Sequence, residues 1–441
     1  MDIKRTIMTS MTQWKKRENK KALLITGARQ IGKTYTVRKF ASENYENVLE
    51  INFAETPSAK LIFDGDLDAK SIISNLTAFS NTQLVENKTL IFFDEIQECP
   101  NARAAIKYLV EDGRFDYIES GSLLGVLYKD VPLLPIGYEE ILHMYPLSLR
   151  EFFVAMGVQK KTLKLIKTCY KKRNPVPEAI HNKMQRLTRL YLAIGGMPAA
   201  ANAYINTNDL AYVHSVQKDI IELYRMDITR YANNKPHVKM IFDAIPSQLS
   251  SVNKRFILKN ISATARMERY ASDFMWLVDA GVALPCYNIR APQEPLAINE
   301  QRNLFKLYAC DIGLLGAMLE EPIQFELIKG NAGINQGSIL ENLAAQELHS
   351  HKFKLRYFDK SKYGEIDFII SSNGNVIPIE IKSGHDYKKH KALDNILKVD
   401  EWNIDTSIAF CADNVSEENK ITYLPWYMLM FIKKQEIKQS F

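Results

Sequence analysis

One short segment near the N-terminus constrains the fold more than any other part of the chain. The apolar run from Ala22 to Thr26 precedes it and a segment with helical spacing follows it, so the segment joins a predicted buried strand to a predicted helix. At such a junction, backbone N–H groups and the positive end of the helix dipole face an anion. The segment fits the pattern GxxxxGK[ST] and reads Gly27-Ala28-Arg29-Gln30-Ile31-Gly32-Lys33-Thr34. It therefore predicts a phosphate-binding loop.

The residue types of this loop suit a nucleoside triphosphate. Lys33 would reach the β- and γ-phosphate oxygens, and the Thr34 hydroxyl would ligate Mg²⁺. The structural alternative is a glycine-containing turn that carries an incidental Lys-Thr pair. The strand before the loop and the helix after it favour the nucleotide-binding interpretation.

Further apolar runs predict the other strands of a parallel sheet. The strand at Thr89 to Phe93 ends in Asp94 and Glu95, at the edge where ligands bind in such sheets. Asp94 would hold the magnesium, and Glu95 would orient or deprotonate a water, a role that favours ATP hydrolysis over phosphoryl transfer to a hydroxyl. Read alone, the pair could also be a solvated strand end. The other predicted strands are Val48 to Phe53 and Tyr117 to Ser120.

Ser120 ends the last of these strands, where a polar side chain could sense the γ-phosphate. Serine and glycine at a strand end also form ordinary turns, so both readings stay open. The expected nucleotide-binding residues are Gly27, Ala28, Arg29, Gln30, Ile31, Gly32, Lys33, Thr34, Tyr35, Asp94 and Ser120, with Lys33 and Glu95 as the catalytic pair.

The rest of the chain changes character along its length. At 441 residues it exceeds what one hydrophobic core usually supports. A mostly helical region contains a basic patch at Lys160 to Arg173 and a break at Gly195 to Pro198. Short helical patterns and a hairpin at Leu284 to Leu307 then suggest a winged helix. The expected parts are an ATPase domain at 1–146, a helical lid at 147–235, a winged-helix-like region at 236–330 and a last α/β domain at 331–441.

Several motifs in order resemble the prokaryotic AAA-type ATPases called archaeal-type ATPases. A basic N-terminal helix is followed by TGARQIGKT, LIFFDEIQ, ESGSLL, PLSLREFF and GGMP, which together cover roughly the first half of the chain. The resemblance implies the Walker A residues Gly27, Gly32, Lys33 and Thr34, and the Walker B residues Asp94 and Glu95.

Two details qualify this resemblance. Gly196-Met197-Pro198 is similar to the G-x-P lid motif of related signal-transduction ATPases. Many members carry Gly-Arg before the PLS motif, whereas this chain has Gly137-Tyr138, so an expected arginine is missing. Arg29 and Arg150 are alternative charge stabilisers, or simply surface arginines.

A second group of charged residues lies near the C-terminus. Asn373-Gly374 separates two apolar runs and predicts a hairpin with a two-residue turn. The turn fixes the register of the two strands, and all the charged partners then lie on one face. The expected facing pairs are Ser372 with Asn375, Asp367 with Glu380, and Glu365 with Lys382.

Two carboxylates held side by side repel each other unless a cation, a shared proton or water relieves them. Asp367 and Glu380 are therefore expected to bind Mg²⁺, and Lys382 could stabilise charge that develops on an attacked phosphodiester. The alternative is a solvent-exposed sheet face on which Lys382 pairs with Glu365.

The same residues resemble the core of PD-(D/E)XK nucleases. Asp367 is followed by Glu380-Ile381-Lys382, and Glu341 lies on the preceding predicted helix. Such a module commonly follows the ATPase above as a C-terminal domain of unknown function. The resemblance implies Glu341, Asp367, Glu380 and Lys382 as catalytic residues, and it leaves open whether the domain cuts nucleic acid or only binds it.

Composition adds few limits. The net charge of +6, from 57 Lys and Arg against 51 Asp and Glu, permits a nucleic-acid partner without requiring one. The five scattered cysteines form no CxxC pair for zinc or redox chemistry. The start lacks a signal-peptide pattern and no run of eighteen apolar residues occurs, so we expect a soluble cytoplasmic protein with no membrane partner.

The fold class that follows is α/β. It comprises an AAA-type P-loop NTPase with a parallel sheet and helical lid, a winged-helix-like middle region and a C-terminal α/β restriction-endonuclease-like domain. The expected function is Mg²⁺-dependent ATP hydrolysis coupled to action on DNA, with a homo-oligomer left open. Two rivals remain: a nucleotide-switched signalling or scaffold protein, and a DNA-binding ATPase without nuclease activity.

Overall fold

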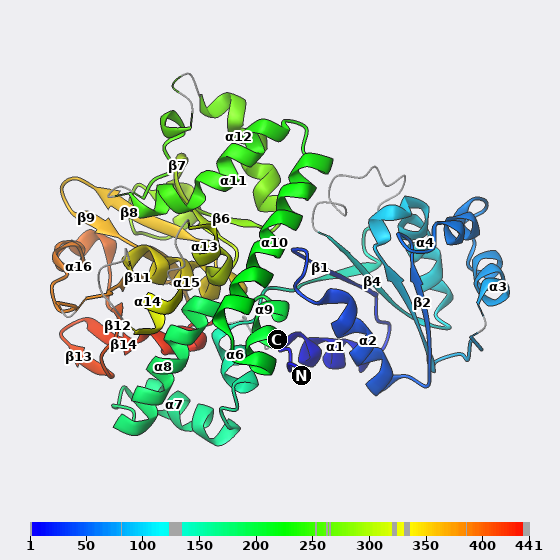
Figure 1. Cartoon of the computed structure of the whole chain (residues 1–441), viewed down its shortest axis with the longest axis horizontal. Helices are drawn as coiled ribbons and strands as arrows, with labels where there is room; N and C mark the ends of the chain where they lie inside the picture. The colour runs from blue at the N-terminus through cyan, green and yellow to red at the C-terminus, as the bar shows by residue number, and fades with distance from the viewer. Residues whose placement is uncertain are drawn as a thin grey trace. The chain divides into compact units, whose positions relative to one another are not determined.

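The computed structural model describes most of the chain, and the described part divides into two compact units (Figure 1). The smaller unit contains Lys4–Tyr145 and Asp279–Gly281, and the larger contains Met1–Ile3, Pro146–Val278 and Val282–Phe441. No described helix is long and apolar enough to cross a lipid bilayer. The described residues are 2–80, 82–122, 135–251, 254–261, 263, 266–319, 324–329, 336–384 and 386–434.

The smaller unit is built on a five-stranded sheet in the order β2-β3-β4-β1-β5, in which every neighbouring pair is parallel. The two apolar runs that form β1 and β3 are buried along their whole length, as expected for strands covered on both faces. All four predicted strands are confirmed. The strands are β1 (Ala22–Gly27), β2 (Asn47–Asn52), β3 (Thr89–Asp94), β4 (Asp116–Ser122) and β5 (Glu139–His143).

Helices cover both faces of this sheet. One core cluster joins alternate residues of the strands, such as Leu24, Ile91 and Phe93, to α3, α4 and η1. The opposite side chains face α2, which contacts β1, β3 and β4, and α1 packs on α2. This arrangement is that of a P-loop NTPase, as predicted. The elements are α1 (Ile7–Lys15), α2 (Lys33–Asn44), η1 (Pro57–Phe63), α3 (Ala69–Phe79), η2 (Ile96–Glu98) and α4 (Pro100–Asp112).

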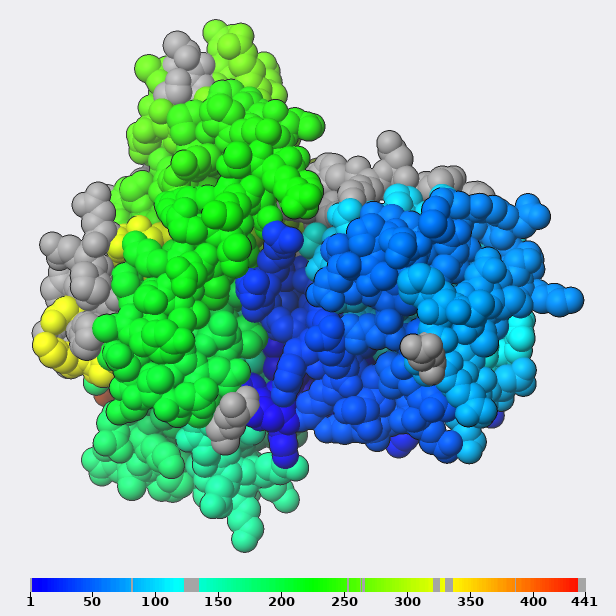
Figure 2. All heavy atoms as spheres, turned by 45° about the vertical axis from the view of Figure 1, so that its right-hand side comes forward, coloured from blue at the N-terminus to red at the C-terminus, as the bar shows by residue number. Residues whose placement is uncertain are grey.

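The larger unit begins with a mostly helical segment, drawn in teal to green, which forms much of that unit's visible surface in Figure 2. Gly195 ends one helix with φ +76°, and Pro198 starts the next. A Cβ atom on Gly195 would lie 2.3 Å from Asp311 Oδ1, so the close approach requires glycine. The helices are α6 (Leu149–Ala155), α7 (Lys160–Lys172), α8 (Glu178–Ile194), α9 (Pro198–Thr207), α10 (Leu210–Tyr231), α11 (Lys235–Ser250), η3 (Leu258–Asn260) and α12 (Met267–Asp279).

The predicted hairpin is present as the antiparallel pair β6 and β7, but β6 also pairs in parallel with β8. The hairpin therefore belongs to a four-stranded sheet of order β7-β6-β8-β9 that joins the middle and C-terminal parts of the sequence. The winged helix stays a prediction. The elements are β6 (Ala283–Ile289), η4 (Leu296–Asn299), β7 (Glu300–Ala309), α13 (Ile312–Met318), α14 (Gln324–Lys329), β8 (Arg356–Lys360) and β9 (Gly364–Ile366).

The larger unit also contains a five-stranded sheet, whose strand order is β10-β11-β12-β14-β13. Helix α15, almost wholly buried, contacts β6 and β7 of one sheet and β11 of the other. It thus places its side chains between the two sheets. The elements are α15 (Gln336–Ser350), β10 (Phe368–Ser372), β11 (Asn375–Ile381), α16 (Lys391–Ile396), η5 (Asp400–Trp402), β12 (Ser407–Cys411), β13 (Ser416–Glu418), β14 (Ile421–Pro425) and η6 (Trp426–Phe431).

Candidate nucleotide site and C-terminal carboxylate pocket

The predicted phosphate loop connects β1 to the first turn of α2. Gly27 and Gly32 have φ values of +154° and +86°, and Gln30 also lies in the left-handed region at +63°. A Cβ atom on Gly27 would lie 2.3 Å from the carbonyl oxygen of Met144, so no larger residue fits there. These backbone angles turn the loop around the N-terminus of α2, where N–H groups lack partners within the helix.

Lys33 lies inside this loop. Its buried Nζ donates hydrogen bonds to the carbonyl oxygens of Gly27, at 3.1 Å, and Ala28, at 2.9 Å. Burial lowers the pKa of Lys33 to about 8, while Glu95 and Asp94 act in the opposite direction. The ammonium group is therefore close to both predicted acidic residues.

Asp94 is 1% exposed and is the centre of a cluster of oxygen atoms. Its Oδ2 accepts a hydrogen bond of 2.9 Å from Thr34 Oγ1, and its Oδ1 accepts one from Ser120 Oγ. The cluster combines the end of β3, the end of β4 and the start of α2, and it brings together Thr34, Asp94 and Ser120. Carboxylate and hydroxyl oxygens are the ligands that Mg²⁺ prefers, so this donor set fits the ion.

Asn52 is a member of this cluster that the sequence reasoning missed. Its Nδ2 lies 3.3 Å from Asp94 Oδ2, and its Oδ1 accepts a hydrogen bond from the Ala54 N–H. A signal was available, because Asn52 is the last residue of β2 and the carboxyl ends of parallel strands meet at one edge.

Glu95 follows Asp94 in a left-handed conformation, with φ +51°. This conformation is uncommon for residues other than glycine and asparagine, and such positions concentrate at functional sites. Gln97 Nε2 donates a hydrogen bond to Glu95 Oε2, so the carboxylate is oriented by its own loop. Glu95 is partly exposed and can meet a water molecule.

The other predicted loop residues play different parts. Ala28 and Ile31 are buried in the core, and the Ile31 carbonyl accepts a 2.9 Å hydrogen bond from Arg5 Nη1. Arg29, Gln30 and Tyr35 are exposed, with Tyr35 at 56%. Ala28 and Ile31 thus offer a ligand only their backbone.

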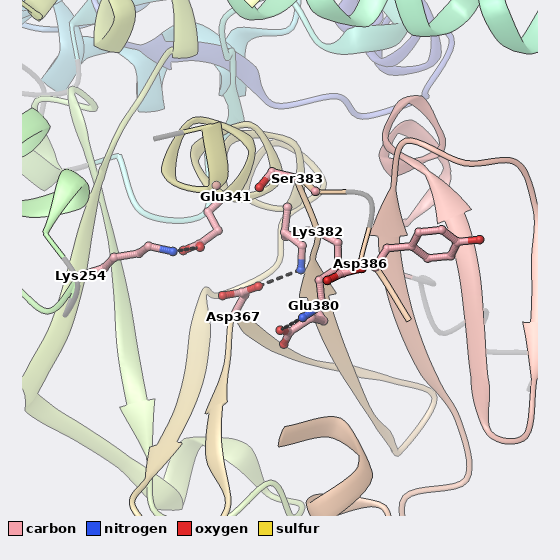
Figure 3. A pocket seen from close by; sticks show the side chains of 11 residues that line it. Lys254, Glu341, Asp367, Glu380, Lys382, Ser383 and Asp386 are labelled. Carbon is pink, nitrogen blue, oxygen red and sulfur yellow. Dashed lines mark hydrogen bonds and ion pairs between the residues drawn. The ribbon is translucent and has the colours of Figure 1, made fainter. Parts of the chain in front are cut away.

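In the larger unit, the structure brings four predicted residues to one pocket of about 350 Å³ (Figure 3). Glu341 comes from α15, Asp367 from the bend between β9 and β10, and Glu380 from β11. Glycine and serine residues after β11 complete one wall. The charged lining residues are Lys254, Glu341, Asp367, Glu380, Lys382 and Asp386.

The predicted hairpin register is confirmed from Ser372 with Asn375 to Phe368 with Ile379. It does not reach the predicted pair of Asp367 with Glu380, and the predicted pair of Glu365 with Lys382 is wrong. The chain bends at Asp367, whose Oδ2 accepts a 2.8 Å hydrogen bond from the Ile381 N–H.

Beyond this bend, Glu365 belongs to β9 and pairs with Asp359 of β8. Its carboxylate meets Lys306, while Lys382 Nζ lies 2.9 Å from Glu380 Oε1. The bend therefore sends the two members of the expected pair to different partners.

Three residues from the middle of the sequence reach the carboxylates, and the sequence reasoning missed all three. Lys254 and the fully buried Lys306 both pair with Glu341, and the Tyr308 hydroxyl donates a 3.1 Å hydrogen bond to Glu341 Oε2. Burial alone would raise the pKa of Glu341, but Lys306 and Lys254 bring it below its ordinary value. A lysine within the apolar strand at residues 304–309 was the available signal.

Asp367 and Glu380 behave in the opposite way. Burial, followed by the charges of Glu341 and Glu380, raises the pKa of Asp367 well above its ordinary range. Burial also raises the pKa of Glu380, against the pull of Lys382. Glu380 Oε2 is buried without a hydrogen-bond partner. Within the described ranges, no three or more His, Cys, Asp or Glu side chains are grouped so that they could hold a metal ion.

Three parts of the chain match family models. Residues 19–153 match an AAA domain, residues 185–323 match the domain of unknown function DUF8612, and residues 336–429 match the domain of unknown function DUF4143. No curated protein matches the chain significantly. The first match agrees with the loop geometry and supports the predicted AAA-type fold of this part of the chain.

Solved structures to which this chain is similar include the Walker-type ATPase of Pyrococcus abyssi, at 12% identity and a TM-score of 0.43, covering 72% of this chain and 96% of that one. The Aeropyrum pernix ORC1 protein in complex with DNA has 12% identity and a TM-score of 0.28, covering 73% and 92%. The Thermotoga maritima RuvB Holliday junction branch migration motor has 14% identity and a TM-score of 0.29, covering 64% and 89%.

Proposed function

We propose that the smaller unit binds ATP with Mg²⁺ and hydrolyses it. The observation that carries this proposal is the cluster in which Thr34 and Ser120 meet Asp94, beside the loop that encloses Lys33. Bound magnesium would be held by Thr34 and Asp94 and would neutralise charge on the phosphate oxygens.

The protein groups have separable tasks in this proposal. Loop N–H groups and Lys33 bind the phosphates, and Lys33 exchanges its carbonyl partners for phosphate oxygens. Glu95 orients the attacking water and accepts its proton. If a homo-oligomer supplies an arginine from a neighbouring copy, turnover per molecule rises with protein concentration.

The matching experiment compares ATP affinity in the parent and in Lys33→Ala by isothermal titration calorimetry. Loss of a charged partner of the phosphates weakens binding by roughly ten- to a hundredfold. Lys39→Ala is the control, because Lys39 lies on the same helix α2 and pairs with Glu43. Equal affinity in the parent and Lys33→Ala would contradict the proposal.

We further propose that the C-terminal pocket is nuclease-like and directed at DNA. Support comes from the meeting of Glu341, Asp367, Glu380 and Lys382 in one pocket (Figure 3). Asp367 and Glu380 would hold a divalent ion, with the unpartnered Glu380 Oε2 as a free ligand. Lys254 and Lys382 already occupy the partner positions of Glu341 and Glu380, so a metal must compete with them.

Plasmid cleavage titrated with Mg²⁺ in the parent and in Asp367→Asn tests this second proposal. Metal-dependent cutting that Asp367→Asn abolishes supports a nuclease. DNA binding without cutting favours a DNA-binding ATPase, and neither binding nor cutting favours a nucleotide-switched scaffold.

A further inference from the structure

Helix α7 and the residues around it carry a one-sided distribution of charge. Between residues 157 and 177 the sequence contains no aspartate or glutamate. The same stretch contains six exposed lysines and one exposed arginine: Lys160, Lys161, Lys164, Lys167, Lys171, Lys172 and Arg173. The teal segment that includes α7 lies at the surface in Figure 2.

The apolar side of α7 is packed against the rest of the unit, so the charged side chains face solvent. Leu163 and Ile166 are buried, and the ring of Tyr170 packs against Phe431 with 5.3 Å between ring centroids. Four lysines at intervals of four, three and four residues then share one side, and they span about 17 Å along the axis. They are Lys160, Lys164, Lys167 and Lys171, which we call the α7 lysine stripe.

Acidic side chains neutralise little of the positive charge of the α7 lysine stripe. Arg173 pairs with Glu417 of β13, but within the described part of the chain no carboxylate forms an ion pair with the six lysines. Further basic groups lie nearby. Burial lowers the pKa of Lys433, and Arg150 and Lys167 lower it further, which indicates that these three cations are close neighbours.

Helix α7 packs against η6, which is hydrogen-bonded to a residue of the carboxylate pocket. Trp426 begins η6 and donates a 3.0 Å hydrogen bond from Nε1 to the carbonyl oxygen of Lys382, a pocket residue. Phe431 ends η6 and packs against Tyr170 of α7. One short helical turn therefore connects the pocket strand to the basic helix within the same compact unit.

We propose that the α7 lysine stripe binds the phosphodiester backbone of a nucleic acid and so holds it on the unit that carries the pocket. This inference rests on the DNA-directed function proposed above. The chemistry matches because a duplex presents a regular row of phosphates, and lysines that neutralise them release counterions. A membrane surface fits less well. The apolar side of α7 is packed against η6, and Leu165, 39% exposed, is the one large aliphatic side chain of this helix that reaches solvent.

The test uses the full chain with Lys160, Lys164, Lys167 and Lys171 all changed to glutamine. The matched control changes Lys70, Lys218, Lys235 and Lys398 to glutamine, because these exposed lysines lie elsewhere and their loss alters the net charge equally. Binding to a fluorescent random-sequence DNA duplex is measured by anisotropy over a series of salt concentrations. ATP turnover of each protein is measured alongside as a check on the smaller unit.

The stripe variant should bind DNA at least about tenfold more weakly at low salt, with a dependence of log affinity on log salt reduced by about 3, whereas the control keeps most of its affinity. Equal loss in both variants, or no loss in the stripe variant, would overturn the inference and leave the proposed function standing. A parent that hydrolyses ATP but binds no DNA would overturn both the inference and the DNA-directed proposal. Binding of the parent to anionic lipid vesicles instead of DNA would assign the stripe to a membrane.

Discussion

The two carboxylate sites of this protein achieve electrostatic balance in different ways. In the smaller unit, Asp94 receives hydrogen bonds from the neutral groups of Thr34, Ser120 and Asn52. In the larger unit, ammonium groups of three lysines lie against Glu341, Glu365 and Glu380. A carboxylate held by neutral donors keeps its charge available for a cation, whereas one paired with lysine already has its counterion. Asp94 thus keeps its charge for the magnesium ion proposed above, whereas a metal ion in the second site has to compete with lysines for Glu341 and Glu380.

The largest effect should come from removing the buried cation of the second site. Lys306→Met leaves Glu341 and Glu365 without their shared partner, and breaking such a buried pair costs about 3–5 kcal/mol of stability. The midpoint of urea denaturation, followed by tryptophan fluorescence, measures this loss.

The comparison predicts a much smaller loss at the first site. Thr34→Val removes one neutral hydrogen bond to Asp94 and should cost about 1 kcal/mol, measured in the same way. Similar losses in Lys306→Met and Thr34→Val would show that the lysines do not hold the second site together.

The carboxyl group of Glu347 differs from those of both sites, because it has neither a lysine partner nor a full set of neutral hydrogen-bond donors. Glu347 Oε1 accepts a 2.7 Å hydrogen bond from the Leu149 N–H, and its Oε2 is buried without a partner. Burial raises the pKa of Glu347 from 4.5 to about 8, and Glu151 adds to this effect. The folded state thus binds this proton more tightly than the unfolded chain does.

It follows that the contribution of Glu347 to stability is largest below pH about 4.5 and is lost as the pH rises through about 8. Glu347→Gln removes this titration and should stabilise the protein at pH 8 by on the order of 3 kcal/mol. Denaturation midpoints measured between acidic and alkaline pH check this, with the exposed Glu268→Gln as control. A parent whose stability does not fall toward pH 8 would contradict the prediction.

A further prediction concerns metal competition in the pocket. Lys254→Met removes the positive charge that lies beside Glu341. The affinity of the pocket for Mn²⁺ should rise roughly tenfold, because the ammonium group no longer repels the metal ion. Electron paramagnetic resonance of free Mn²⁺ measures this affinity in Lys254→Met and in the Asp367→Asn and Lys254→Met double variant. Unchanged affinity would mean that the lysine does not oppose a metal there.

The first site was largely predictable because its signals are local. The glycine positions, the strand before the loop and the acidic pair after β3 lie in short stretches, and the meeting of strand ends follows from parallel pairing. Strand β5 was missed because its residues are half exposed at the sheet edge and form no apolar run. Asn52 could have been found by extending the same edge argument to β2.

The second site was only partly predictable. The hairpin turn fixed its register for several pairs, but no local pattern indicated the bend at Asp367 that separates Glu365 from Lys382. Lys254 and Lys306 reach Glu341 from positions distant in sequence, through the sheet that joins β6 and β7 to β8. Such contacts depend on tertiary packing, which strand patterns alone do not encode.

The most direct measurement of the central claim is ATP turnover, with ATP affinity, in the parent and in Glu95→Gln. If Glu95 prepares the water beside Asp94-bound magnesium, the variant keeps its ATP affinity and its turnover falls by about 10²–10⁴-fold. Equal turnover in the two proteins, or a folded parent with no affinity for ATP in the presence of Mg²⁺, would contradict the account.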